Sequence, residues 1–188
     1  GRLYNSAAVI DADGRLLGSY RKIHIPHDPL FYEKDYFRPG DLGFKVFKTR
    51  YADFSVLICY DQWFPEAARA CALQGAQILF YPTAIGRIQG HVPKEGDWLS
   101  AWTTIQRSHA IANSVHVAAV NRVGREGKLR FWGSSFISDP FGNVLSQASQ
   151  TREVVLLARV DLAGNRRVRE GWGFMRNRRP KSYSLLTR

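Results

Sequence analysis

The sequence predicts a layered α/β (α+β) fold in one domain that spans residues 1–188. Three observations carry this prediction: an apolar strand pattern at 54–58, a helix pattern that opens at Pro65 and closes at Gly75, and a second apolar strand pattern at 77–81. Pro just inside a helix and Gly just past its end are the usual helix boundaries. A strand, a helix and a strand within about thirty residues form a βαβ unit, whose parallel strands are buried on both faces.

The residues ahead of this unit predict a hairpin and a long loop. Residues 7–11 and 16–25 are predicted strands, joined at Asp13-Gly14, a dipeptide typical of tight hairpin turns. Residues 26–43 show no sustained period and are predicted to be a loop. Long loops in compact domains are usually functional or disordered, and the aromatic side chains of this one favour an ordered loop.

The residues after the unit predict one long helix, several strands and a short last helix. Apolar side chains recur at helical spacing over 97–114. Asp161 is the predicted N-cap of the last helix. The predicted strands lie at 115–120, 131–138, 143–146 and 153–160.

Composition narrows the class of protein. Of the 188 residues 45% are hydrophobic, so the chain has enough apolar side chains for a sizeable core. Its net charge of +11 raises nucleic acid or an acidic surface as a partner. No apolar run is long enough to cross a membrane. Two cysteines do not make a disulfide framework, which favours a reducing compartment, the cytoplasm. The chain starts directly on an apolar strand pattern without Met, so we expect a longer natural protein.

Cys59 is the first candidate for chemistry. It follows the strand at 54–58 and precedes a helix, where backbone N–H groups and the helix dipole lower the pKa of a thiol. The same turn would direct the N–H of Tyr60 at the oxyanion that forms when the sulfur attacks a carbonyl group. The alternative is a small buried side chain at the end of a core strand. Cys71 lies among alanines in the predicted helix and is expected in the core.

Lys22 and Glu33 are two further candidates, each with a structural alternative. Lys22 lies within an apolar strand, where a cation is costly unless it meets a negative group, and it could stabilise an oxyanion. The alternative is an edge-strand lysine in solvent. Glu33 lies in an aromatic loop and could orient a lysine or a substrate amine, or be a solvated loop acid. Glu66 is more simply a carboxylate in the first turn of a helix.

Metal and nucleotide motifs are not found in the sequence. The five histidines lack zinc-site spacing, so no metal is expected. No complete dinucleotide fingerprint, P-loop or Gly-x-Ser-x-Gly motif occurs.

Three segments together resemble the nitrilase superfamily of carbon–nitrogen hydrolases, and the similarity extends over essentially the whole chain. They are residues 20–26 (YRKIHIP), 33–41 (EKDYFRPGD) and 59–66 (CYDQWFPE). The resemblance implies an α-β-β-α sandwich, a dimer or larger homo-oligomer, no metal or organic cofactor, and a Glu/Lys/Cys catalytic triad. Cys59 matches the nucleophile and Lys22 the lysine that stabilises the oxyanion. Glu33 matches an additional glutamate that supports the lysine and the substrate amide.

The resemblance also implies a reaction and a set of substrate contacts. The reaction is hydrolysis of a linear N-carbamoyl amine such as N-carbamoylputrescine, or of another small amide or nitrile. Relatives that act on carbamoyl amino acids can carry arginine just after the cysteine, whereas Gln62 and Trp63 follow here, which disfavours an acidic substrate. Which acid would bind a cationic amine is left open. The predicted oxyanion and substrate-binding residues are Tyr60, Asp61, Gln62, Trp63, Tyr81, Pro82 and Thr83, although Asp61 could be structural instead.

One departure from the family pattern concerns the base. The family's general-base glutamate precedes the lysine, but ahead of Lys22 this chain has only Asp11 and Asp13, both at the predicted hairpin turn. We therefore expect the chain to be the C-terminal part of a longer protein. Two readings from other classes stay open: a catalytically incomplete fragment, and a basic nucleic-acid-binding module, the less favoured of the two. The basic residues behind the latter are Arg166, Arg167, Arg169, Arg176, Arg178, Arg179, Lys181 and Arg188.

Overall fold

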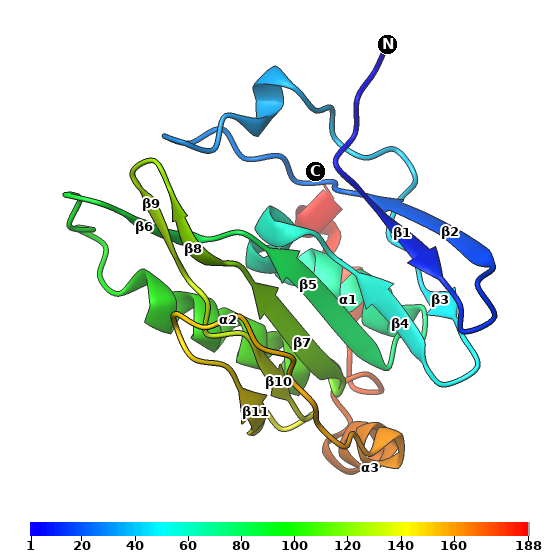
Figure 1. The fold of residues 1–188 in the computed structure, drawn as a ribbon. Coiled ribbons are helices and arrows are strands. Elements are labelled where there is room, and N and C mark those ends of the chain that lie inside the picture. Colours follow the sequence, from blue (N-terminus) through cyan, green and yellow to red (C-terminus); the bar gives the residue numbers. More distant parts are fainter. Residues whose placement is uncertain (188) are drawn as a thin grey trace.

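A six-stranded mixed sheet forms the centre of the computed structural model, which describes residues 1–187 (Figure 1). The three strands β4, β5 and β7 run parallel, and the other pairings are antiparallel. The parallel pairs confirm the predicted βαβ unit. In sheet order the strands are β11 (Val144–Gln147), β10 (Phe136–Ser138), β7 (His116–Asn121), β5 (Ile78–Thr83), β4 (Asp53–Val56) and β3 (Phe47–Lys48).

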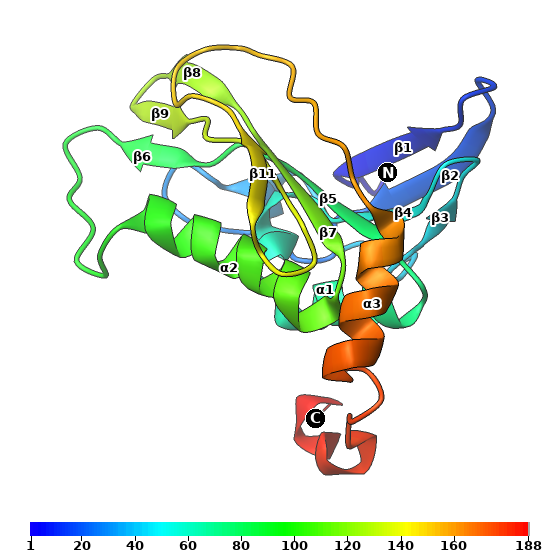
Figure 2. The same cartoon turned by 90° about the horizontal axis from the view of Figure 1, so that it is seen from below.

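Two helices cover one face of this sheet (Figure 2). Helix α1 (Pro65–Leu73) starts on the predicted proline, and helix α2 (Trp98–Asn113) starts after Asp97. The Asp97 side chain accepts a hydrogen bond from the N–H of Leu99 at 3.0 Å, which satisfies one of the free donors of the first helical turn. These two helices were predicted from the sequence and are confirmed.

Two small sheets lie on the side of the central sheet that faces away from α1 and α2 (Figure 2). One is the hairpin of β1 (Ser6–Ile10) and β2 (Leu16–Arg21). The other holds three antiparallel strands in the order β6 (Gly86–Ile88), β9 (Leu129–Trp132) and β8 (Val123–Glu126). The layered α/β class is confirmed, with helices on one side of the central sheet and the small sheets on the other.

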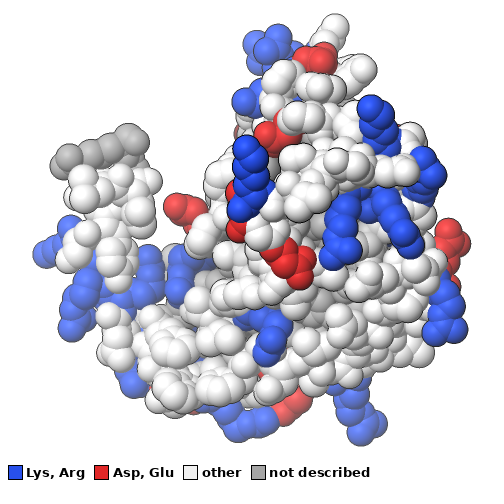
Figure 3. All heavy atoms as spheres, turned by 90° about the vertical axis from the view of Figure 1, so that its left-hand side faces the viewer, with Lys and Arg blue, Asp and Glu red and all other residues white. Residues whose placement is uncertain are grey.

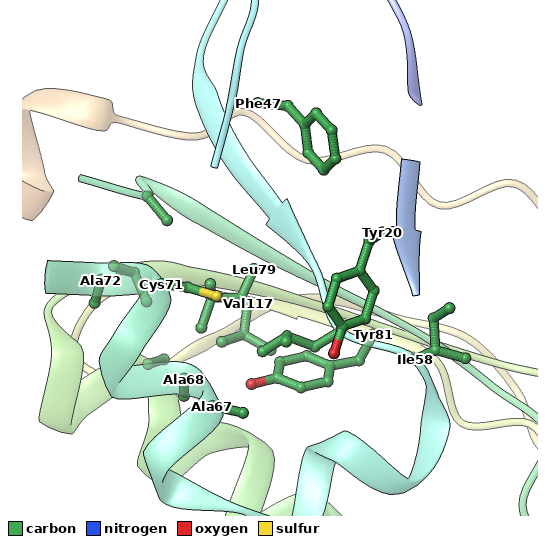
Figure 4. Close-up of a cluster of buried hydrophobic side chains, with 14 of the residues drawn as sticks. Tyr20, Phe47, Ile58, Ala67, Ala68, Cys71, Ala72, Leu79, Tyr81 and Val117 are labelled. Atoms are coloured by element: carbon green, nitrogen blue, oxygen red, sulfur yellow. The ribbon is translucent and has the colours of Figure 1, made fainter. Parts of the chain in front are cut away.

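Small side chains let α1 lie close to the sheet (Figure 4). Ala68 and Cys71 of α1 are fully buried against Leu79 of the sheet, and Tyr20 of the hairpin covers the other side of this core. Complete burial of a leucine side chain such as Leu79 stabilises the fold by about 2 kcal/mol. Cys71 is a core residue, as predicted.

The predicted strand at 153–160 is wrong. These residues form no strand, and the side chains of Val155 and Leu157 are 86% and 84% exposed. The segment alternates apolar residues as a strand does, but among the described residues no neighbouring strand pairs with it. A strand needs both the pattern and a partner that supplies its hydrogen bonds.

Two other strand boundaries differ from the prediction. Strand β2 ends at Arg21 instead of residue 25. The N–H of Lys22 still bonds to Asn5, but its O accepts the N–H of Gly40 from the loop at 26–43. Strand β5 runs through Pro82, where we expected it to stop. The O of Phe80 accepts the N–H of Leu57, so alternate residues of β5 face the β4 side. At position 82 a backbone N–H would face the β4 side, and proline has none. Because β4 ends at Val56, no hydrogen bond of the ladder is lost there.

The predicted strand at 131–138 is divided into β9 and β10. Gly133 and Ser134 separate the two strands with φ angles of 52° and 56°, in the left-handed region. The turn redirects the chain from the small three-stranded sheet to the edge of the central sheet.

The C-terminal residues form helix α3 and two short 3-10 helices. Helix α3 (Leu162–Trp172) starts at the predicted cap, where the side chain of Asp161 accepts the N–H of Ala163 at 3.0 Å. The short helices are η3 (Pro180–Ser182) and η4 (Ser184–Thr187), and a further one, η1 (Glu33–Asp35), lies in the ordered loop at 26–43. No helix among the described residues is long and apolar enough to span a membrane.

The basic residues do not form one uninterrupted patch on the face drawn in Figure 3. On the face drawn in Figure 3, lysines and arginines are interspersed with acidic and uncharged side chains. Two arginines of α3 are ion-paired, Arg166 with Glu170 at 2.7 Å and Arg167 with Asp161. This pairing weakens the nucleic-acid reading of the basic C-terminal residues, of which Arg188 lies outside the described part of the chain.

Candidate active site

Cys59 occupies a strained turn at the carboxyl end of β4. It is the first residue of the 3-10 helix η2 (Cys59–Trp63), and its φ angle is +47°. A residue other than glycine adopts this left-handed backbone conformation mainly where the surrounding structure imposes it. Such residues cluster at functional sites. The sequence correctly placed Cys59 between a strand and a helix, but the helix that it opens is η2, one turn ahead of α1.

The turn places Cys59 on the wall of a cavity of about 340 Å³. This volume is at the small end of the range for small-molecule sites. The cavity lies between the end of β5, the loop at 26–43 and the sheet of β8 and β9. Its lining residues are Asn5, Leu30, Phe31, Glu33, Ile58, Cys59, Pro82, Thr83, Ala84, Arg122, Glu126, Leu129 and Phe131.

An ion pair with a buried lysine lies near Cys59. The Nζ of Lys22 lies 2.7 Å from both carboxylate oxygens of Glu33, and the Lys22 side chain is fully buried. Asn5 donates a further hydrogen bond to Glu33 at 3.2 Å. A buried cation needs such a partner, so the solvent-exposed alternative for Lys22 does not hold.

The backbone around Lys22 explains how a lysine comes to lie inside. Its N–H bonds to the O of Asn5, and its O accepts the N–H of Gly40, both at 2.8 Å. Gly40 makes this close approach possible, because a Cβ atom there would lie 2.2 Å from the backbone oxygen of Arg21. The chain therefore holds Lys22 from both sides, which directs its side chain inward.

Asp61 joins the turn of Cys59 to the segment of Lys22. Its fully buried carboxylate accepts hydrogen bonds from the Tyr20 hydroxyl at 2.8 Å and from the N–H of Ile58 at 2.9 Å. It also accepts the N–H of His24 at 3.0 Å and lies 2.7 Å from Nδ1 of His24. Tyr20 and His24 flank Lys22 on both sides in the sequence, so Asp61 ties the lysine segment to the cysteine segment. This geometry favours the structural alternative for Asp61.

The electrostatics of Cys59 differ from the sequence prediction. Burial raises the pKa of its thiol above the usual value, and the negative charges of Glu33 and Asp61 act in the same direction. The positive charge of Lys22 and a hydrogen bond from the N–H of Ala84 lower this pKa, but burial outweighs them. A helix dipole does not make this thiol a thiolate at neutral pH, so the sulfur needs a base that takes its proton when it attacks.

Other predicted site residues lie behind the cavity wall. Gln62 is fully buried, and its Oε1 accepts hydrogen bonds from Thr83, Trp102 and Gln106 at 2.8 to 3.0 Å. Tyr81 is buried in the core. These two positions hold the wall in place from behind.

The remaining predicted residues divide between the wall and its surroundings. Pro82 and Thr83 line the cavity directly, next to Cys59. The ring of Tyr60 packs edge-on against Phe64 at 5.5 Å, and Trp63 packs against a cluster around Trp102. Side chains of Tyr60 and Trp63 are therefore engaged with aromatic neighbours outside the cavity lining.

Sequence reasoning missed nine of the residues that line this cavity, and four of them bring a charged side chain, a side-chain amide or a backbone N–H to the site. Ala84 contributes only a backbone N–H, for which a sequence contains no signal. Asn5 gives no functional signal in the sequence, because its segment predicts only the start of the hairpin. Arg122, just ahead of β8, and Glu126, at the end of β8, also line the cavity, although they lie more than 60 residues after Cys59 in the sequence. Their spacing of four fits two side chains on one face of a strand, which was the available signal.

The two aspartates ahead of Lys22 serve the hairpin turn. Asp11 accepts the N–H of Ala12 at 2.8 Å, and Asp13 accepts the N–H of Arg15 at 2.9 Å. The carboxylates that line the cavity are Glu33 and Glu126. Residues 1–187 contain no cluster of three or more His, Cys, Asp and Glu side chains that could bind a metal ion.

Known proteins are similar to this chain in sequence and in fold. The family model for carbon–nitrogen hydrolases matches residues 1–170. An N-carbamoylputrescine amidase from Solanum tuberosum is 50% identical over 97% of this chain, and a citrullinase from Francisella tularensis is 46% identical over 98% of it. These alignments cover 63% and 65% of the two relatives, so the chain spans less than two thirds of their length.

Solved structures agree with the sequence comparison. The crystal structure of a carbon–nitrogen hydrolase from Helicobacter pylori superposes with a TM-score of 0.94 at 46% identity, over 98% of this chain and 66% of that one. A mutant amidase from Nesterenkonia superposes with a TM-score of 0.74 at 29% identity, over 95% of this chain and 59% of that one. In that mutant, the acetamide moiety of fluoroacetamide is added covalently to the active-site cysteine.

Proposed function

This chain belongs to the carbon–nitrogen hydrolase family of the nitrilase superfamily, and from that premise we propose that it carries the nucleophile of an enzyme that hydrolyses a linear N-carbamoyl amine. The observation that carries this proposal is the position of Cys59 in a strained turn on a small cavity that Glu33 also lines, with the buried Lys22 paired to Glu33. The relatives named N-carbamoylputrescine amidase and citrullinase support an N-carbamoyl compound as the substrate.

In the first step the sulfur of Cys59 attacks the carbamoyl carbon. A base removes the thiol proton, the C–S bond forms, and the carbonyl oxygen becomes an oxyanion. The ammonium group of Lys22 and the N–H of Tyr60 stabilise this oxyanion, and Glu33 orients the lysine. The bond from carbon to the substituted nitrogen then breaks, and the free amine leaves with a proton.

In the second step water hydrolyses the carbamoyl group that remains on the sulfur. A base activates the water, the C–S bond breaks, and the thiol regains its proton. The carbamic acid that forms separates into carbon dioxide and ammonia. The sum is one N-carbamoyl amine and one water giving amine, carbon dioxide and ammonia. The resemblance assigns the base to a glutamate that precedes the lysine in the family, so experiments use the complete gene product that contains this chain.

The other site residues divide into contact and positioning roles. Pro82 and Thr83 line the cavity and contact the substrate in this proposal. Asp61 and Gln62 act through their neighbours, Asp61 on the turn of Cys59 and Gln62 on Thr83. Trp63 and Tyr81 support the wall from behind.

We also propose a homo-oligomer in a reducing compartment, the cytoplasm, with residues 1–188 as a single domain. Both cysteines are free, and the chemistry requires Cys59 to be reduced. Large apolar side chains near the C-terminus are exposed, among them Trp172 and Leu185 at 59% and 70%. Such exposure favours association with a second copy, and light scattering of the complete gene product measures it directly.

Product analysis on a panel of substrates tests the proposed function. The complete gene product is incubated with N-carbamoylputrescine, L-citrulline, a simple aliphatic amide and an aliphatic nitrile. We expect ammonia and free amine in equal amounts from the N-carbamoyl compounds, at higher kcat/KM than from the amide or nitrile. Preference for the amide or nitrile would keep the reaction class and replace the substrate. If the protein hydrolyses none of the four compounds, the proposal is contradicted and a catalytically incomplete chain is favoured.

A further inference from the structure

Two charged side chains on the cavity wall lie outside the group of Cys59, Lys22 and Glu33. They are Arg122, just ahead of β8, and Glu126, the last residue of that strand. The Nη1 of Arg122 lies 2.5 Å from Oε2 of Glu126, and its guanidinium lies 4.3 Å from the ring centre of Phe131. Their side chains are 47% and 66% exposed, so solvent and ligands reach both of them.

The strand geometry leaves room beside this ion pair. Residues two apart in a strand face the same side, so Gly124 lies between Arg122 and Glu126 on this face. Gly124 has no side chain, and its φ angle of +97° disfavours one. No atom lies within 4 Å of the position that a Cβ atom would take there. The ion pair of Arg122 and Glu126 therefore borders an open space at Gly124.

The same backbone segment connects this pair to the nucleophile. The O of Thr83 accepts the N–H of Arg122 at 3.1 Å. The next residue, Ala84, donates its N–H to Cys59. A substrate whose carbamoyl group lies at Cys59 thus extends along 82–84 toward Arg122 and Glu126, within a single cavity.

The charges decide which end group the pair accepts. A lone ammonium group would share Glu126 with Arg122 and meet the repulsion of its guanidinium. A lone carboxylate would meet the repulsion of Glu126 in the same way. A ligand group that carries both charges replaces the ion pair of Arg122 and Glu126 by two ion pairs. Its carboxylate binds Arg122, and its ammonium group binds Glu126. An exposed ion pair contributes little stability, so opening it for such a ligand costs little.

We propose that Arg122 and Glu126 bind the far end of the substrate and that this end is an ammonium group beside a carboxylate, as in an N-carbamoylated diamino acid. The inference rests on the proposed function and names the substrate class within it. It also supplies the acid for a cationic amine that sequence reasoning left open, namely Glu126. A substrate of this kind has no net charge at its far end, which agrees with the expectation that an acidic substrate is disfavoured.

Three probes with the same reacting group test this inference on the complete gene product. L-Citrulline carries both end charges, N-carbamoylputrescine carries the ammonium alone, and 4-ureidobutyrate carries the carboxylate alone. We expect kcat/KM for L-citrulline to exceed that for each of the other two by about tenfold or more, because a site built for two polar partners discriminates against ligands that lack one.

Two variants separate the roles of the pair. Arg122→Gln should lower kcat/KM for L-citrulline about tenfold and leave that for N-carbamoylputrescine equal or higher. Glu126→Gln should lower kcat/KM for both compounds. Arg125→Gln is the matched control, since Arg125 bonds to Gln89 and the O of Gly127 and does not line the cavity. Thermal unfolding confirms that each variant is folded.

The outcomes separate this inference from the proposed function. Wild-type protein that prefers N-carbamoylputrescine would overturn the inference and leave the proposed function intact. Equal loss on both substrates in Arg122→Gln would do the same, because a merely structural arginine does not distinguish end groups. Wild-type protein that hydrolyses none of the three probes would contradict the proposed function, and this inference with it.

Discussion

Replacement of Asp61 by asparagine should destabilise the fold and disturb the active site together. The carboxylate is fully buried, and its four donors come from Tyr20, Ile58 and both the backbone and the ring of His24. Asparagine has nearly the same shape but carries one oxygen and one NH2 group. Either orientation of this amide points the NH2 group at a backbone N–H, that of Ile58 or that of His24.

The size of the effect follows from these contacts. A hydrogen bond to a charged group contributes about 1.5 to 3 kcal/mol, and a buried donor left without a partner costs about 1 to 3 kcal/mol. Asp61→Asn retains two acceptor contacts at its remaining oxygen and places one backbone N–H against another donor. We expect the free energy of unfolding to fall by about 3 kcal/mol, the lower end for a broken buried charge interaction.

Urea unfolding of the complete gene product measures this change. Asp41→Asn is the control, because Asp41 pairs with Arg21 at 2.6 Å but lies in solvent, and its replacement should have a clearly smaller effect. Ammonia release by folded Asp61→Asn should also fall, since the link between the segments of Lys22 and Cys59 is weakened. A free energy of unfolding within about 0.5 kcal/mol of wild type would show that the buried carboxylate of Asp61 does not stabilise the fold.

Three further predictions follow from burial and close packing. Burial raises the pKa of Cys59 above its usual value of 9.0, so the rate of its alkylation by iodoacetamide should still increase above pH 9. Lys22→Met removes the charge that favours the thiolate and should move this pH–rate profile to higher pH. An unchanged pH–rate profile in Lys22→Met would contradict this. Burial lowers the pKa of His109 below 6.5, so the unfolded chain takes up a proton first, and stability present above pH 6.5 is lost as the pH falls below it. His109→Gln should reduce this loss in urea titrations at neutral and mildly acidic pH, and an identical loss would exclude His109 as its source. Gly86→Ala places a Cβ atom 2.3 Å from a backbone oxygen of β9, so its thermal midpoint should fall by several degrees, whereas an unchanged midpoint would show that β6 moves aside freely.

The elements predicted correctly are those whose signals are local. Pro65 and Gly75 bound α1, Asp97 precedes α2, and Asp161 caps α3, because capping depends on a few neighbouring residues. The strand at 153–160 was wrong because pairing depends on a partner elsewhere in the fold. The continuation of β5 through Pro82 depends likewise on where β4 ends.

The candidate site divides in the same way. The turn of Cys59 has a local pattern. Lys22 and Glu33 were candidates with structural alternatives until the family resemblance favoured them, and the structure places their charged groups 2.7 Å apart. The raised pKa of Cys59 was not predictable, since burial is a property of the assembled layers. Arg122 and Glu126 reach the cavity through the pairing of β8 with β9, which a single strand pattern does not show.

Ammonia release by cysteine variants of the complete gene product tests the central claim most directly. Wild type, Cys59→Ala and Cys71→Ala are compared on L-citrulline and N-carbamoylputrescine, with thermal unfolding as a check on folding. Cys71 is the matched control, because it is free and buried in α1 away from the cavity. We expect Cys59→Ala to release no ammonia and Cys71→Ala to remain active. Release by Cys59→Ala at the wild-type rate would show that the sulfur of Cys59 is not the nucleophile.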